Sequence, residues 1–379
     1  MTGVAPRPIS IDVNLAFIAP GRVGGSEQYL ARQLLGLPTD AGLDVTLHCH
    51  PDFAVAHDEL TTRFRTRTMP LRGDRRAARI AAEHTVLARR TRTADVVHHG
   101  GGTAPLVGRR PIVLTVHDLQ YLRHPDHFGS GRLAYLSRLM GPSVRRAEIV
   151  TVPSAFVKST VIDAFGTDPE RVVVVPHGVP DLDASASARA DVDAVLGRFG
   201  LERGRYLLYP AITHPHKAHA VLVDMMDHLA GADRDLRLVL TGGPGRSEAD
   251  VARRIDASAS RDRILRPGRV DDADLAALLS GAGAMVFPSE YEGFGAPLVE
   301  AMVAGTPVVA GAADAVVEVV GPAGVVVREA TGEAWANGVV DALGRRSELI
   351  ERGGLRRQAF TLERSGTALA DAYRRALSS

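Results

Sequence analysis

The sequence has little of three things that would fix its class at once: cysteine, long apolar runs and an excess of one charge. Its only cysteine, Cys49, can form no disulfide within the chain. No apolar run approaches the roughly 20 residues that a membrane-spanning helix needs. Lysine and arginine number 45 against 44 for aspartate and glutamate, so the net charge is +1. These absences exclude a disulfide framework, a membrane-spanning helix and general attraction to nucleic acid.

Patterns typical of metal sites and export signals are also missing. The sequence contains no HExxH motif and no pair of CxxC motifs, and His214, His216 and His219 have no carboxylate or cysteine at ligand spacing. We therefore expect no bound metal and no cofactor. The first residues carry no signal-peptide pattern, which together with the single thiol favours a cytoplasmic location.

The length and the patterning indicate two domains. At 379 residues the chain exceeds what one hydrophobic core usually organises. Short β-branched runs alternate with amphipathic stretches, which is typical of parallel sheets with helical crossovers. We therefore expect an α/β fold of doubly wound, Rossmann-like domains. Strands are predicted at residues 11–17, 44–48, 95–98, 112–116, 149–152, 172–175, 206–210, 236–240, 264–265, 284–287, 307–310 and 324–327. Helices are predicted at residues 26–35, 74–89, 132–146 and 155–165, and after each strand of the second half.

Turn-forming and small residues break this alternation near the midpoint, at residues 177–188. We place a domain boundary near residue 182, so that residues 1–182 form the first domain. Two such domains would face each other across a cleft, and ligands of doubly wound sheets bind outside the carboxyl ends of the strands. Functional motifs should therefore follow strands directly.

The most informative stretch is SEYEGFGAPLVEAMVAGTP at residues 289–307, which follows an apolar strand. Pro297 suits the first position of a helix, so residues 298–304 should form a short helix that points its N-terminus back at the loop. Gly293 and Gly295 would let backbone amides meet a ligand, and free amides at a helix N-terminus suit a diphosphate. Glu292 and Glu300 could accept hydrogen bonds from sugar diols. On spacing alone, Glu292 could instead cap the helix and Glu300 could be a solvated helix residue.

This stretch resembles the E-x7-E motif of retaining GT-B glycosyltransferases of family 4, with Glu292 and Glu300 as its two ends. The resemblance implies that Glu292 meets the transferred sugar, Glu300 the ribose of the nucleotide, and the backbone of Phe294 and Gly295 the sugar hydroxyls. It also implies two Rossmann-like domains: residues 1–182 would bind the acceptor and residues 183–355 the nucleotide sugar. Gly293, Phe294, Gly295 and Ala296 are therefore predicted donor-binding residues.

Lys217 follows the first strand of the second domain, where a cation can neutralise a diphosphate. The alternative is a lysine that faces water near a helix end. Many relatives carry an arginine about five residues earlier, whereas this sequence has Ile212. Arg246, after the turn TGGPG, is a candidate substitute for that cation.

Two further loops resemble donor-binding elements of the family. The loop PGRVDD at residues 267–272 would place Arg269 and Val270 beside the nucleotide base, and otherwise it is a turn before a helix. The loop PGRVGGSE at residues 20–27 follows the first strand, so Gly24 and Gly25 could approach a phosphate or the acceptor.

Histidines follow two strands of the first domain. The element VHHGGGT contains His98 and His99, which we predict to contact the acceptor together with Asp118. The element TVHDL contains His117, which matches the cleft histidine of the family and is predicted to act in catalysis with Lys217 and Glu292. A lone histidine is more often structural, and HGGG could also suggest a hydrolase oxyanion loop, but no GxSxG elbow occurs.

The last residues, 356–379, resemble the closing helix of the family, which returns to the first domain, although Leu362 replaces the usual tryptophan. The resemblance implies front-face chemistry: the anomeric bond stretches toward an oxocarbenium-like state, and the departing diphosphate takes the acceptor proton. No protein nucleophile is then expected. The histidine elements look most like those of mannosyltransferases that use GDP-mannose.

The acceptor is expected to be a glycan or a lipid-linked glycan. Arginines crowd the region before the third predicted strand, and such a segment could touch an anionic membrane surface or simply be a solvated face. They are Arg63, Arg65, Arg67, Arg72, Arg75, Arg76, Arg79, Arg89, Arg90 and Arg92.

Other proteins could use the same fold. A GT-B epimerase would need acid and base groups near C2 of the sugar, and a phosphorylase usually needs pyridoxal phosphate or a phosphate site. A non-catalytic nucleotide-sugar-binding protein could lose His117 or Glu292. Both residues are present, which favours an enzyme.

Overall fold

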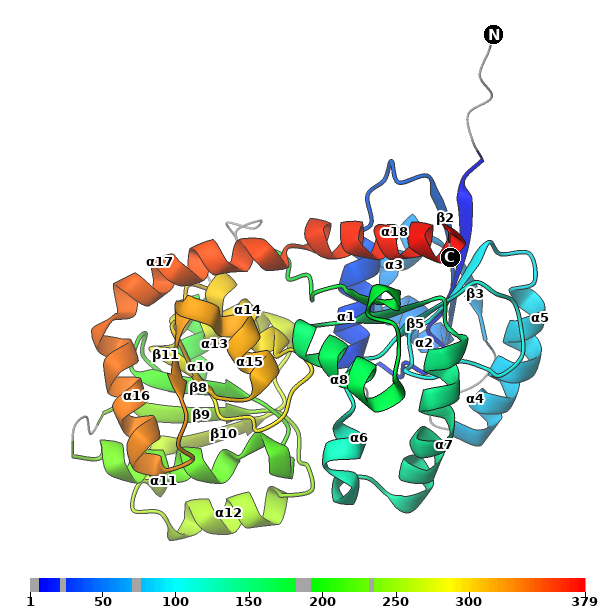
Figure 1. Cartoon of the computed structure of the whole chain (residues 1–379). Coiled ribbons are helices and arrows are strands. Elements are labelled where there is room, and N and C mark those ends of the chain that lie inside the picture. The colour runs from blue at the N-terminus through cyan, green and yellow to red at the C-terminus, as the bar shows by residue number, and fades with distance from the viewer. Residues whose placement is uncertain (1–6, 21–24, 70–75, 182–191, 232–234, 379) are drawn as a thin grey trace. The chain divides into compact units, whose positions relative to one another are not determined.

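The computed structural model describes residues 7–20, 25–69, 76–181, 192–231 and 235–378. The chain divides into two units, drawn in Figure 1. Unit 1 comprises Met1–Pro180 together with Thr361–Ser379, and unit 2 comprises Asp181–Phe360. The predicted boundary near residue 182 lies beside this division, and the segment that returns to unit 1 begins at Thr361 rather than at residue 356.

The described residues of unit 1 form a seven-stranded parallel sheet in the order β3-β2-β1-β4-β5-β6-β7. The strands are β1 (Ile9–Asn14), β2 (Leu43–Cys49), β3 (Arg65–Thr68), β4 (Val96–His99), β5 (Ile112–Thr115), β6 (Ile149–Val152) and β7 (Val172–Val174). The central strands are buried runs, as expected for a parallel sheet covered on both faces.

The helices of unit 1 alternate with these strands. They are α1 (Gly25–Leu35), α2 (Pro51–Ala56), α3 (Asp58–Arg63), α4 (Arg76–Ala82), a π-helical turn (Glu83–Leu87), α5 (Ala88–Arg90), α6 (Gln120–Arg123), α7 (Ser130–Arg146), α8 (Ala155–Phe165) and α18 (Leu362–Ser378). Local chemistry sets their ends: Ser154 Oγ accepts from Val157 N at 3.2 Å to cap α8, and Gly166 ends that helix at φ 61°.

The closing helix α18 belongs to the core of unit 1. Leu369 and Tyr373 are fully buried with Tyr29 and Leu30 of α1. The two helices approach backbone to backbone, because a Cβ at Gly366 would lie 1.9 Å from the carbonyl carbon of Gly36. Only glycine fits this contact, so the predicted return of the last helix to the first domain is confirmed.

The described residues of unit 2 form a six-stranded parallel sheet in the order β10-β9-β8-β11-β12-β13. The strands are β8 (Tyr206–Pro210), β9 (Arg237–Thr241), β10 (Ile264–Gly268), β11 (Ala284–Phe287), β12 (Val308–Gly311) and β13 (Gly324–Val327). The helices are α10 (Val192–Arg198), α11 (His219–Leu229), α12 (Glu248–Ala257), α13 (Asp272–Gly281), α14 (Ala296–Val303), α15 (Asp314–Val320), α16 (Gly332–Gly344) and α17 (Arg346–Arg356). Figure 1 shows α11 and α12 on one face of the sheet, with α13 and α14 on the other.

The α/β class with two doubly wound units is therefore confirmed, and three local predictions are wrong. The strand β3 (Arg65–Thr68) was not expected, because an exposed RTRT edge strand has no apolar face to mark it. The helix expected at 74–89 is interrupted by the π-helical turn. The helix α14 begins at Ala296, so Pro297 is its second residue rather than its first.

Candidate functional site

The glycine loop after β11 leads directly into α14. Gly295 is the residue before the helix, at φ 96° and ψ 54°, and a Cβ there would also lie 2.7 Å from Leu298 Cδ1. Glycine is thus required on both conformational and steric grounds. Phe294 is buried and packs edge to face on Phe360, with 5.3 Å between the ring centres. Its side chain is therefore part of the hydrophobic core, and a ligand at the loop would contact its backbone.

The carboxylate of Glu292 faces Lys217. Lys217 Nζ donates to Glu292 Oε1, although 75 residues separate the two in sequence. Their side chains are only 19% and 15% exposed. No side chain caps α14, so the alternative interpretation of Glu292 as a helix cap is wrong. Glu300 lies in the middle of α14 and is half-buried.

Buried hydrogen bonds hold the two loops together. The Tyr209 hydroxyl at the end of β8 donates to the Lys217 carbonyl at 2.9 Å and lies 3.0 Å from Ser289 Oγ. Glu290 N donates to the His216 carbonyl at 2.8 Å. The strands β8 and β11 are neighbours, and the strand order reverses between them. Ligands of doubly wound sheets bind at such a point.

The short 3₁₀ turn Pro215–Lys217 presents the lysine. Ala218 follows it at φ 48°, the only described residue other than glycine in the left-handed region. L-residues adopt this conformation at a cost, so the surrounding contacts hold the turn in a strained form. Lys217 Nζ also lies 5.7 Å from the centre of the Phe287 ring.

A second glycine turn, after β9, packs against the loop that carries Ile212. A Cβ at Gly245 would lie 2.4 Å from the Thr213 carbonyl oxygen. Thr213 Oγ1 accepts from Gly245 N at 2.7 Å and donates to Glu248 Oε2 at 2.7 Å. Sequence reasoning missed this threonine, which no motif marks. Ile212 is 43% exposed, and Arg246 is exposed at the end of the same turn.

The predicted base-binding loop lies between β10 and α13. Arg269 is exposed and Val270 is half-buried. Asp271 caps α13 by accepting from Asp274 N at 2.8 Å, so the helix begins where the loop pattern predicts.

In unit 1, His117 follows β5. Its Nε2 lies 2.8 Å from the Gly100 carbonyl, which can only accept, so Nε2 carries the proton. Burial lowers the pKa of His117. The ring is therefore neutral at pH 7, and Nδ1 is left as an acceptor with no partner among the described residues. Tyr29 packs edge-on against the ring at 5.4 Å.

His98 lies in the core of unit 1. Its ring is fully buried, with Nδ1 2.9 Å from the Tyr373 hydroxyl and Nε2 2.8 Å from Thr115 Oγ1. Both nitrogens are occupied by the core, which does not support an acceptor contact. His99, the next residue, points to the opposite face of the strand.

Two further predicted residues of unit 1, Asp118 and Gly25, lie at the starts of helices. Asp118 Oδ1 accepts from Gln120 N at 2.9 Å, so this side chain closes the turn that opens α6. Gly25 is the first residue of α1, and a Cβ there would meet no atom within 4 Å. Gly24 lies outside the described residues.

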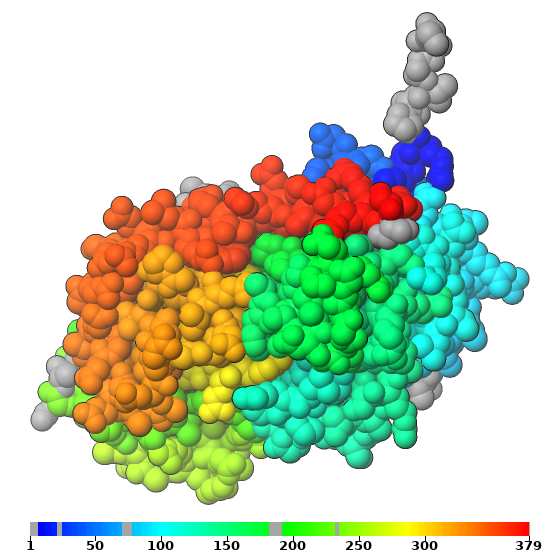
Figure 2. Space-filling view, in the orientation of Figure 1, coloured from blue at the N-terminus to red at the C-terminus, as the bar shows by residue number. Residues whose placement is uncertain are grey.

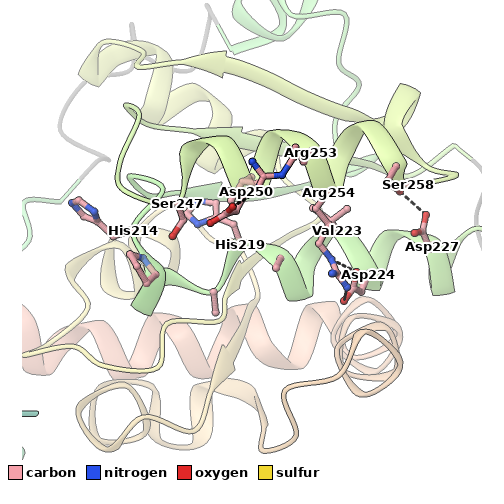
Figure 3. Close-up of a pocket in the computed structure, with 15 residues that line it drawn as sticks. His214, His219, Val223, Asp224, Asp227, Ser247, Asp250, Arg253, Arg254 and Ser258 are labelled. Atoms are coloured by element: carbon pink, nitrogen blue, oxygen red, sulfur yellow. Dashed lines mark hydrogen bonds and ion pairs between the residues drawn. The ribbon is translucent and has the colours of Figure 1, made fainter. Parts of the chain in front are cut away.

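A groove of about 590 Å³ lies along α11 and α12 in unit 2 (Figure 3). Its charged side chains pair with one another: Arg254 with Asp224, and Arg253 with Asp250. None of the predicted donor-binding residues lines it. We therefore place the candidate site at the β8–β11 loops instead.

Within the described ranges, no cluster of three or more histidine, cysteine, aspartate or glutamate side chains has the arrangement of a metal site. No described helix combines the length and apolar character that crossing a bilayer requires.

Both halves of the chain match family models. Residues 23–181 match the model for glycosyltransferase family 4, and residues 204–345 match the model for glycosyl transferases group 1. The chain belongs to the family 4 glycosyltransferases. The second match contains Lys217 and the whole glycine loop.

The glycosyltransferase is similar to curated and solved proteins over most of its length. It is 28% identical to O-antigen chain mannosyltransferase B of Escherichia coli over 285 residues, 74% of each chain. It is 32% identical to the D-inositol 3-phosphate glycosyltransferase of Xylanimonas cellulosilytica over 260 residues, 62% of this chain and 60% of that one. Its fold resembles that of Anabaena HepE in complex with UDP and glucose, with a TM-score of 0.75, 20% identity and coverage of 96% and 98%. The glycosyltransferase thus has the GT-B fold.

Proposed function

We propose that the chain transfers a hexose from a nucleotide diphosphate sugar to a hydroxyl of a glycan or glycolipid, with retention of anomeric configuration. The observation that carries this proposal is the contact of Lys217 with Glu292 at the ends of β8 and β11, next to the N-terminus of α14.

The parts of this site suit different parts of the donor. A lysine ammonium and free amides at a helix N-terminus stabilise the charge that grows on a departing diphosphate. The Glu292 carboxylate accepts hydrogen bonds from sugar hydroxyls. We propose that Arg269 and Val270 lie beside the base and that Glu300 holds the ribose. Metal ions and cofactors take no part in this scheme.

His117 is proposed to orient a sugar hydroxyl. Because Nε2 is held by Gly100, the free Nδ1 lone pair is the atom that can accept from a hydroxyl. Because burial lowers the pKa of His117, the neutral ring is a weak base, and the acceptor proton is left to the diphosphate.

Mannose from GDP-mannose is the donor we favour. The sequence similarity to O-antigen chain mannosyltransferase B supports this choice. The similar fold of HepE, which was solved with UDP, instead favours a uridine diphosphate sugar. Both are nucleotide diphosphates, so the site described above would serve either one.

A thermal-shift panel of GDP-mannose, UDP-glucose and ADP-glucose tests the donor. A ligand at 100 times its dissociation constant should stabilise the protein by about 2.7 kcal/mol. We expect the largest shift with GDP-mannose, and the anomeric proton of the transferred sugar, followed by NMR, should keep the donor's configuration. Absence of a shift with all three would contradict the proposed function.

We also propose that the enzyme works on the cytoplasmic side of a membrane, in peripheral contact with anionic lipid. The stretch from α4 to α5, cyan in Figure 2, lies at the surface of unit 1. A groove of about 640 Å³ there is lined by Arg89, Arg92 and Arg109. Val107 on its rim is 56% exposed, and cations around exposed apolar side chains suit lipid headgroups.

Sedimentation with liposomes tests this contact. We expect binding to vesicles with 30% phosphatidylglycerol that weakens as salt rises, and a loss of at least fivefold in Arg89→Gln/Arg92→Gln, since each surface cation contributes about 1 kcal/mol. Arg374→Gln, on the exposed side of α18, is the control. Binding that is absent or insensitive to salt would remove the membrane contact.

A further inference from the structure

Three loops of unit 2 leave the carboxyl ends of neighbouring strands, with β9 between β8 and β10. One follows β8 and leads to Lys217, one is the glycine turn after β9, and one follows β10 and carries Arg269 and Val270. Under the proposed function, the first loop binds the diphosphate of the donor and the third lies beside its base. The separation of these two loops must then match the nucleotide, so contacts that fix the separation strengthen donor binding.

The backbone of the turn after β9 contacts both neighbouring loops. A Cβ at Gly242 would lie 2.5 Å from the Ala211 carbonyl oxygen, so only glycine fits against the β8 loop. On the other side, Gly242 N donates to the Gly268 carbonyl at the end of β10, at 2.8 Å. Ser247 N donates to the Thr213 carbonyl at 2.9 Å and closes the turn. The turn therefore joins the β8 loop to the β10 loop.

Side chains join the same three segments through Glu248. Thr213 is 4% exposed, and its Oγ1 accepts from Gly245 N at 2.7 Å. The hydroxyl proton is therefore donated to Glu248 Oε2, which lies 2.7 Å away. Arg266 of β10 donates to Glu248 Oε1 at 2.6 Å. Hydrogen bonds from Thr213 and Arg266 lower the pKa of Glu248, so the carboxylate is charged at pH 7.

We propose that Thr213, Glu248 and Arg266 are positioning residues that hold the β8 and β10 loops at the separation that a nucleotide diphosphate requires. This role rests on the proposed function, because it assumes that the donor contacts both loops. Thr213 should matter most of the three. The side chains of Arg266 and Glu248 are 31% and 35% exposed, and ion pairs that face water contribute little, whereas the Thr213 hydroxyl is buried between two partners.

Thr213→Val and Thr213→Ser test the proposal, because valine lacks the hydroxyl and serine keeps it. The measurement is calorimetric titration of the full chain with GDP, UDP and ADP. For the nucleotide that the native chain binds most tightly, we expect Thr213→Val to raise the dissociation constant about tenfold, since the fraction of molecules with correctly spaced loops falls by that factor. Thr213→Ser should stay within about threefold of the native value, because its hydroxyl can make both hydrogen bonds.

Thr306→Val is the matched control. Thr306 is 2% exposed in the same unit, and its hydroxyl donates to the Leu279 carbonyl at the amino end of β12. This variant also loses a buried hydrogen bond, so it should melt at a lower temperature but keep the native nucleotide affinity. All titrations are made at a temperature at which far-ultraviolet circular dichroism shows each variant to be folded.

Glu248→Ala provides a second variant that can be compared with Thr213→Val. It removes the acceptor of the Thr213 hydroxyl from the first residue of α12, where more than a third of the amino-terminal side chains of the helix face water. We expect a similar loss of nucleotide affinity. The double variant should bind at most about threefold more weakly than either single variant, because both changes remove the same hydrogen bond.

Three results would overturn the positioning role: native affinity in Thr213→Val, a loss in Thr213→Ser as large as in Thr213→Val, or an equal loss in Thr306→Val. Absence of binding of all three nucleotides by the native chain would contradict the proposed function and the positioning role together. The two failures are therefore distinguishable, since the first leaves nucleotide binding by the native chain intact.

Discussion

Glu292→Ala is expected to lower turnover about 100- to 1,000-fold while the dissociation constant of the nucleotide diphosphate changes less than about threefold. The Glu292 carboxylate contacts Lys217 and would accept from the sugar, so its interactions matter most as charge develops in the transition state. A loss of this size corresponds to about 2.7–4 kcal/mol of transition-state stabilisation.

The measurement is kcat with saturating donor, together with calorimetric titration of the nucleotide diphosphate. Glu290→Ala is the matched control, because Glu290 is an exposed glutamate of the same loop. Turnover in Glu292→Ala as high as in the control would remove Glu292 from the site.

Lys217→Ala is expected to lower turnover by a similar factor and, unlike Glu292→Ala, to weaken nucleotide diphosphate binding about tenfold or more. The ammonium meets charge that exists in the bound donor and grows on the leaving group. Lys217→Arg should recover little of the lost turnover. A planar guanidinium differs in size and geometry from the compact ammonium, which contacts Glu292 and lies near the Phe287 ring.

The chain offers a natural control for this experiment. Of its 45 lysines and arginines, two are lysines, Lys158 and Lys217. Lys158→Ala on α8 should leave kcat and nucleotide affinity unchanged. Since Lys217 and Glu292 are in contact, the double variant should lose less than the product of the two single losses. Full additivity would indicate that the two side chains act separately.

The sequence predicts the local parts of this site well. A buried strand, a glycine loop and a helix are encoded within 19 contiguous residues, so strand β11 and helix α14 are found at nearly the expected positions. The start of α14 is missed by one residue, because a glycine in the left-handed region lets the helix begin at Ala296, before Pro297.

Contacts between distant segments are what the sequence does not reveal. The pairing of Lys217 with Glu292 follows from β8 and β11 being neighbours, which only the order of strands decides. His98 and His99 look equivalent in the motif, yet alternation along β4 buries one against Tyr373 and turns the other toward Asn14.

The central claim is that the loops after β8 and β11 bind an activated sugar. The most direct measurement is the crystal structure of the chain soaked with the nucleotide sugar that stabilises it most. We predict diphosphate density beside Lys217 and the amides before α14, with the sugar against Glu292. Density for the same ligand in the groove between α11 and α12, with these loops empty, would contradict the account.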